Sequence, residues 1–189
     1  MVHSEKRRLL LFIPVLIWMG VIFMFSSDNG SISSMQSGRV SYMVASAVDS
    51  VFRLDMSDVE RLDFSHSLSY LVRKTAHFSE YFILGLLLYA AISVNFGSVL
   101  ASMDADRGFL RIIKLRYFVP VVVVFGYAGT DELHQYFVPD RCCSFKDVLI
   151  DTAGGLTGIL IIGLIRYIRG GTAYNKANNS VRRTGNEDM

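Results

Sequence analysis

Residues 129–141 read GTDELHQYFVPDR and follow directly on an almost wholly apolar run, YFVPVVVVFGYA at residues 117–128. The apolar run predicts a helix that crosses lipid, and the acids, histidine and glutamine behind it predict a polar end to that helix. The interpretation of this polar helix end depends on whether other predicted helices also carry polar groups at the same membrane surface.

Composition places the chain in a membrane. Hydrophobic residues make up 51% of the 189 residues and are gathered in long blocks, which is typical of membrane proteins. No basic stripe is interleaved with aromatic residues, so nucleic acid is not a predicted partner. A spanning helix needs about 20 mainly apolar residues. Four blocks predict spans at about 9–26, 76–95, 117–135 and 147–168.

The predicted fold is therefore an all-α integral membrane helical bundle with four transmembrane helices. Residues 1–170 form the predicted transmembrane domain, and residues 171–189 a flexible cytoplasmic tail. The first span is not interpreted as a cleaved signal peptide, because FMFSSDNG at its end offers no A-x-A cleavage site.

Lysine and arginine predict the orientation, because they gather on the cytoplasmic side of membrane proteins. With a cytoplasmic N-terminus, the N-terminal segment, the 95–116 loop and the C-terminal tail hold 12 of the 19 basic residues. The 27–75 segment on the other side is rich in acids. Both termini are accordingly predicted to be cytoplasmic in a multi-pass plasma-membrane protein.

The long outer segment is predicted to contain an amphipathic helix. Apolar residues recur at helical spacing at Val40, Val44, Val48, Val51 and Phe52, with polar residues between them. This pattern indicates a helix on the outer leaflet. A cover for the outer face of the bundle and a lid over a site are both compatible with it.

Polar side chains mark the outer ends of three predicted spans. Asp147 and Asp151 share a helix face, which places Asp151 about 6 Å deeper. An Asp at the membrane centre costs roughly 2.5–3.5 kcal/mol, so such acids need partners. The opposing interpretation is that these charges only mark the lipid boundary. The candidate ligand-binding residues are Lys74, His77, Glu80, Tyr81, Asp131, Glu132, Gln135, Arg141, Asp147 and Asp151.

These residue types suggest acid–base chemistry or binding. Glu132, Glu80 and His77 are the candidate catalytic residues, although no nucleophile with an activating neighbour stands out. No H-E-x-x-H or C-x-x-C motif is present, so neither a metal nor another cofactor is predicted. Gly154 and Gly158 lie four apart in the last span, which favours close helix packing.

Three stretches carry a resemblance to a known family: FSS at 25–27, RKTAHFSEYFILG at 73–85, and DELHQYFVPDRCCSFKDVLIDTAGGLTG at 131–158. The chain resembles VanZ-like bacterial membrane proteins. The resemblance implies a multi-pass protein of the cell envelope, and the namesake of the family is associated with resistance to the glycopeptide teicoplanin. The matched positions are Lys74, His77, Glu80, Tyr81, Glu132, Gln135, Arg141, Asp147 and Gly154.

The chain departs from the family pattern at three places. Asp140 stands where the family often has glycine, and Asp151 where it often has asparagine. The Cys142–Cys143 pair is not an expected family feature, and adjacent cysteines predict free thiols or a bond to another chain.

Three functions remain open at this point. The first is a polar outer-leaflet site that engages a membrane lipid or a lipid-linked glycan, with Arg141 and Lys74 holding phosphate. The second is a membrane-embedded hydrolase or transferase acting on lipid-linked envelope precursors. The third is a purely structural polar network. The residues do not decide whether a reaction is catalysed, and they leave a homodimer open.

Overall fold

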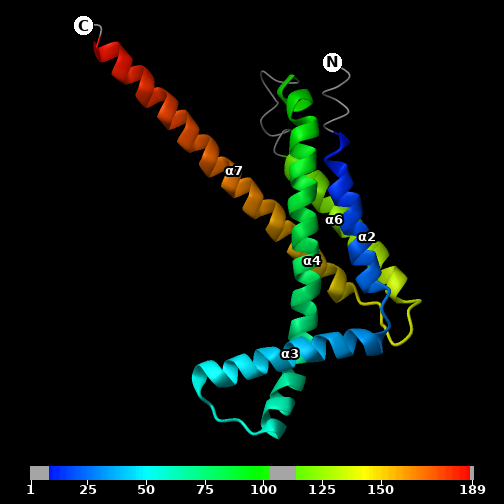
Figure 1. Cartoon of the computed structure of the whole chain (residues 1–189). Helices are drawn as coiled ribbons and strands as arrows, with labels where there is room; N and C mark the ends of the chain where they lie inside the picture. Colours follow the sequence, from blue (N-terminus) through cyan, green and yellow to red (C-terminus); the bar gives the residue numbers. More distant parts are fainter. Residues whose placement is uncertain (1–8, 103–113, 188–189) are drawn as a thin grey trace.

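The structure is a computed structural model that describes residues 9–102 and 114–187 (Figure 1). All regular structure in these two ranges is helical. The helices are α2 (Phe12–Ser26), α3 (Gly30–Phe52), α4 (Asp58–Ser102), the π-helical η1 (Lys114–Phe118), α6 (Val119–Gln135) and α7 (Phe145–Glu187).

The prediction of an all-α membrane bundle is confirmed, but the number of four spans is not. Of the described helices, only Asp58–Asn95 of α4 and Phe145–Arg169 of α7 are each long and apolar enough to cross a membrane. A third span is counted only if α2 and α3, bent by 101° at their junction, are taken together. At 1.5 Å per residue, the 15 residues of α2 and the 17 of α6 reach only about 22 and 26 Å. Both lengths fall short of a hydrocarbon core of ~30 Å.

The helix directions alternate as a multi-pass chain requires. Figure 1 shows α2 and α6 running one way through the bundle, and α4 and α7 running the other way. The start of α2 therefore lies toward the same end of the bundle as the end of α7. The backbone of α7 continues through residues 171–187, where the sequence predicts a flexible tail. Flexibility of that segment stays a prediction.

Glycines bring α4 and α7 into close contact. A Cβ atom added at Gly154 would overlap the carbonyl of Phe78, and one added at Gly158 would overlap the carbonyl of Phe82. From the other side, a Cβ atom at Gly85 would overlap the carbonyl of Gly155. The predicted packing role of Gly154 and Gly158 is therefore what the structure shows, and α4 is the partner.

Helix α3 lies across α4 at one end of the bundle (Figure 1). The buried positions recur at every fourth residue, at Ser37, Ser41, Ala45 and Asp49, and this face packs on α4. The apolar face predicted from the sequence is largely uncovered, with Val51 74% exposed. A helix with small polar residues inside and apolar residues outside suits a lipid environment.

The turn between α3 and α4 is held by one carboxylate. Asp49 Oδ1 accepts a hydrogen bond from the Met56 amide at 3.1 Å, and Asp49 Oδ2 accepts from Arg61 Nη2 at 2.8 Å and Nε at 3.2 Å. The Met56 amide, followed by the Arg61 side chain, holds the pKa of Asp49 below its ordinary value.

This turn is expected to open in acid. Because the pKa of Asp49 is lower in the folded protein, its contribution to stability is fully present above about pH 4 and is lost as the pH falls through the folded-state value. Hydrogen exchange of residues 53–57 should accelerate below that pH, after correction for intrinsic rates. Asp49→Asn should exchange faster at neutral pH and lose this acid step. An identical acid step in the variant would assign the transition to another group.

Candidate functional site

The polar residues predicted from the sequence gather where α3 meets the bundle, and two of them form an ion pair. Lys74 Nζ lies 2.5 Å from Asp147 Oδ1, with side chains only 17% and 21% exposed. The pair joins α4 to the first turn of α7. Lys74, predicted to hold a phosphate, thus already has an anionic partner.

Glu132 joins α6 to the start of α7. Its Oε2 atom accepts a hydrogen bond from the Ser144 amide at 2.9 Å, and the residue is 2% exposed. Ser144 immediately precedes α7, whose first amides otherwise have no partner within the helix. Glu132 was a candidate catalytic residue, but in the structure its carboxylate makes a structural contact with the start of α7.

Arg141 fastens the 136–144 loop to the neighbouring helices. Its Nε donates to the Asp28 carbonyl at 3.1 Å, and its Nη1 donates to Gln135 Oε1 at 3.3 Å. Nη2 reaches the Phe25 carbonyl at 3.5 Å. Gln135 Nε2 in turn donates to Asp131 Oδ2 at 3.3 Å. The Arg141 guanidinium therefore positions the loop. Its donors are already used by protein acceptors, whereas a phosphate-binding arginine would keep them for the ligand.

Asp140 adopts a backbone conformation that favours glycine. Its φ angle is 59°, in the left-handed region. Its carbonyl lies so close to Gly30 that a Cβ atom there would overlap it, and the Gly30 amide donates to the Pro139 carbonyl at 3.1 Å. The departure from the family glycine at this position therefore has a steric cost, which aspartate tolerates better than most residues.

Asp140→Gly is expected to stabilise the protein slightly. Glycine removes a left-handed penalty of roughly 1 kcal/mol, while its greater freedom in the unfolded chain offsets part of the gain. The melting temperature in detergent should rise by a few degrees at most. Asp140→Val, with a branched side chain at the same position, should lower it. A lower melting temperature for Asp140→Gly would mean that the aspartate side chain itself stabilises the loop.

A second group of polar side chains lies deeper, between the helices. Asp131 and Asp151 are 2% and 1% exposed, and the buried hydroxyls of Ser26 and Tyr81 lie beside the Asp131 carboxyl. The Asp131 carboxyl can thus accept from these hydroxyls and from Gln135, whereas no hydrogen-bond partner is found among the described residues for either Asp151 oxygen. Unpartnered buried polar atoms lower stability, so hydrogen bonding within the bundle does not account for Asp151.

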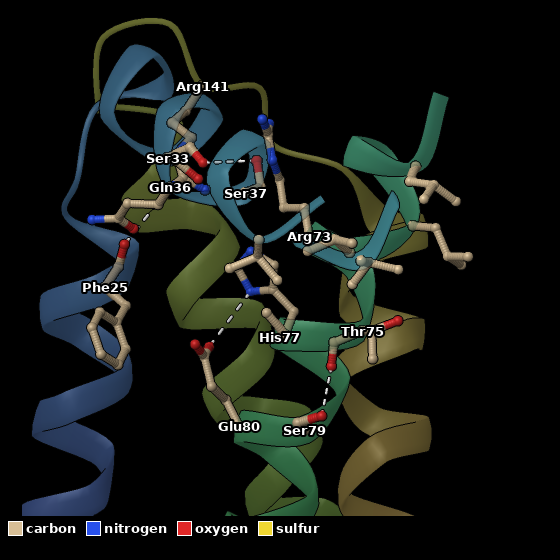
Figure 2. A pocket seen from close by; sticks show the side chains of 16 residues that line it. Phe25, Ser33, Gln36, Ser37, Arg73, Thr75, His77, Ser79, Glu80 and Arg141 are labelled. Carbon is tan, nitrogen blue, oxygen red and sulfur yellow. Dashed lines mark hydrogen bonds and ion pairs between the residues drawn. The ribbon is translucent and has the colours of Figure 1, made fainter. Parts of the chain in front are cut away.

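A hollow of about 570 Å³ opens beside this cluster, on the side of α3 that faces the bundle. We call it the bundle-side hollow. Its walls are mainly apolar and come from α3 and α4: Val40, Val44, Leu68, Leu71, Val72 and Ala76. Its polar lining includes Gln36, Arg73, His77, Glu80 and Arg141. Figure 2 shows His77 between Arg73 and Glu80, with Arg141 at the same end of the hollow as Arg73.

Arg73 is the residue that sequence reasoning left out of the site. Its Nη2 donates to Ser34 Oγ at 2.7 Å, whereas its Nε is buried and has no partner in the described part of the chain. Burial, followed by the nearby charge of Arg73, lowers the pKa of Arg141. The two guanidinium groups are thus close enough to repel. The sequence does not distinguish Arg73 from the adjacent Lys74, because only the crossing of α3 decides which one faces the hollow.

His77 and Glu80, the two candidate catalytic residues on α4, lie near each other without a hydrogen bond between them. His77 Nδ1 lies 3.8 Å from Glu80 Oε2, beyond hydrogen-bond distance. The Glu80 carbonyl accepts a hydrogen bond from Trp18 Nε1 at 2.8 Å, which ties this turn of α4 to α2. No group of three or more His, Cys, Asp or Glu side chains suited to a metal ion occurs in the described ranges.

Residues 11–166 match the family described as VanZ/LLP1. The chain belongs to the VanZ/LLP1 family. The match begins before α2, ends within α7 and includes both groups of polar residues, so the resemblance read from the three motifs is confirmed. Comparisons with curated proteins and with solved structures give no match for this VanZ/LLP1 protein.

Proposed function

We propose that this VanZ-like protein lies in the bacterial inner membrane and holds the anionic group of a lipid or lipid-linked envelope component in the bundle-side hollow. The observation that supports it is a pair of arginines at one end of a hollow whose walls are mainly apolar. Neither Arg73 nor Arg141 forms an ion pair with a carboxylate of the described chain. Neighbouring guanidinium groups without carboxylate partners favour an anion such as phosphate.

The two arginines have different roles in this proposal. Arg141 positions the loop and contributes positive charge, because its donors are directed to Asp28, Gln135 and Phe25. Arg73 contacts the ligand, since its buried Nε has no other acceptor. The apolar side chains of α3 and α4 contact the tail of the ligand. Both termini are cytoplasmic in this proposal, so the hollow lies in the outer leaflet.

Arg73→Gln tests the proposal directly. Native mass spectrometry of the detergent-purified protein would measure binding of phosphatidylglycerol against zwitterionic phosphatidylcholine with the same tails. The wild type should prefer phosphatidylglycerol, and Arg73→Gln should weaken that binding about tenfold, the equivalent of ~1.4 kcal/mol. Arg169→Gln, which removes the same charge from an exposed position on α7, is the matched control. Equal binding of both lipids by the wild type would overturn the proposal.

The link between the family and glycopeptide resistance extends the proposal to the cell. A null strain carrying the wild type should tolerate more teicoplanin than one carrying Arg73→Gln at equal membrane abundance. Equal susceptibility of these two strains would separate lipid binding from resistance.

A second candidate is a hydrolase or transferase that acts on a lipid-linked envelope precursor. The observation in its favour is that His77 and Glu80 line the same hollow as the arginines. Glu132 is the weaker acid–base candidate because its carboxylate holds the Ser144 amide. Glu80→Gln should then leave abundance normal while the envelope lipid profile changes. An unchanged profile at normal abundance would speak for binding without chemistry.

A further inference from the structure

A second hollow, of about 740 Å³, lies on the opposite side of α3 from the first. We call it the far-side hollow. Only α3 and the early turns of α4 line it, whereas the bundle-side hollow also includes Phe25 of α2 and Arg141 of the loop. The two hollows therefore lie on either side of the crossing of α3 over α4 that is seen in Figure 1.

Arg73 lines both hollows and connects them. Its Nη2 donates to the hydroxyl of Ser34, which lines the far-side hollow, and its Nε is buried without a partner. A phosphate bound at Arg73 would thus have apolar walls on the bundle side of α3 and a different lining on the far side.

The far-side lining carries cationic and hydroxyl groups. Arg39 and His66 are exposed in it, and neither forms an ion pair with a described carboxylate. Hydroxyl groups come from Ser34, Ser65 and Ser69, of which those of Ser65 and Ser69 donate to the carbonyls of Leu62 and Ser65 and can still accept a hydrogen bond. Guanidinium, imidazole and hydroxyl groups together match a head group with several hydroxyls next to a negative charge.

We propose that one ligand occupies both hollows: a phosphodiester lipid with its phosphate at Arg73, its tail on the bundle side and a polyhydroxylated head group on the far side. This inference rests on the proposed function and narrows its ligand class. This placement of tail and head group agrees with the fold. The tail lies on the side of α3 that faces the apolar helices, and the head group lies on the side away from them.

The test compares two lipids of equal charge. Phosphatidylinositol and phosphatidylglycerol with the same tails carry one phosphodiester each, but the inositol ring is the larger polyhydroxylated head group. Native mass spectrometry of the full-length protein in detergent should show phosphatidylinositol bound about fivefold more tightly, the effect of one added hydrogen bond of ~1 kcal/mol.

Gly38→Leu blocks the far-side hollow without disturbing the helix. A Cβ atom at Gly38 would meet nothing within 4 Å, and leucine is the better helix former. The preference for phosphatidylinositol over phosphatidylglycerol should vanish in Gly38→Leu and in Arg39→Gln, because both variants alter the lining of the far-side hollow. Arg169→Gln should keep the preference.

The outcomes separate this inference from the function on which it rests. If the wild type binds both anionic lipids equally, or if the preference survives in Gly38→Leu, the far-side hollow does not hold the head group and the inference is wrong. Loss of binding to both lipids in Arg73→Gln would leave the proposed function intact in that case. If the wild type binds neither anionic lipid more tightly than phosphatidylcholine, both proposals are overturned.

Discussion

Gly158→Leu is expected to remove most of the folded protein from the membrane. A Cβ atom at this position would overlap the backbone carbonyl of Phe82, and a backbone group cannot move aside as a flexible side chain can. Overpacking costs about 1–3 kcal/mol in a well-packed core, and here it separates α4 from α7. Membrane abundance and the fraction of monodisperse protein in detergent would be measured.

Gly126→Leu in α6 is the matched control for Gly158→Leu. It makes the same substitution in an apolar helix, at a position where a Cβ atom meets nothing within 4 Å. It should accumulate at the wild-type level. Normal abundance of Gly158→Leu would mean that the close contact of α4 and α7 is not needed for folding.

Arg141→Ala is expected to destabilise the protein rather than only weaken its ligand binding. The substitution removes the donors that hold Asp28 and Gln135, and hydrogen bonds of charged groups contribute roughly 1.5–3 kcal/mol each. A loss of about 3 kcal/mol corresponds to a fall in melting temperature of roughly 6–12 °C for a domain of this size. The melting temperature would be measured in detergent without added lipid.

Arg141→Lys separates the contribution of hydrogen-bond geometry to stability from the contribution of positive charge. Lysine keeps the positive charge but lacks the planar fork that reaches both the Asp28 carbonyl and Gln135. It should restore only part of the melting temperature. An unchanged melting temperature for Arg141→Ala would return Arg141 to the ligand-binding role expected from the sequence.

Much of the candidate site could be predicted from residue type and position. Acids, a histidine and a glutamine next to apolar runs predicted polar helix ends on one side of the bundle, and the structure places Lys74, Asp147, Glu132 and Gln135 together there. The residue that each polar side chain contacts was harder to predict. Lys74 was expected to hold phosphate, whereas the structure pairs it with Asp147, because spacing along the chain does not say which helices touch.

Helix α3 illustrates why the rest could not be predicted. Its apolar stripe was visible in the sequence, but the stripe does not say what the opposite face contacts. The structure packs the small polar face on α4, and this crossing creates both hollows and directs Arg73 between them. A contact between elements far apart in the chain has no local signal.

The sequence by itself determined the class of fold and the family. Long apolar blocks require lipid and helices, since backbone polar groups in hydrocarbon need partners within their own segment, and the three motifs agree with the VanZ/LLP1 match over residues 11–166. Tertiary structure alone decided which cation faces the hollow and which is already paired. The helix bounds, which the sequence left open, make α2 and α6 shorter than a single spanning helix requires. The sequence gives the chemistry of each side chain directly, whereas ion-pair partners and cavities form only when the helices pack against one another.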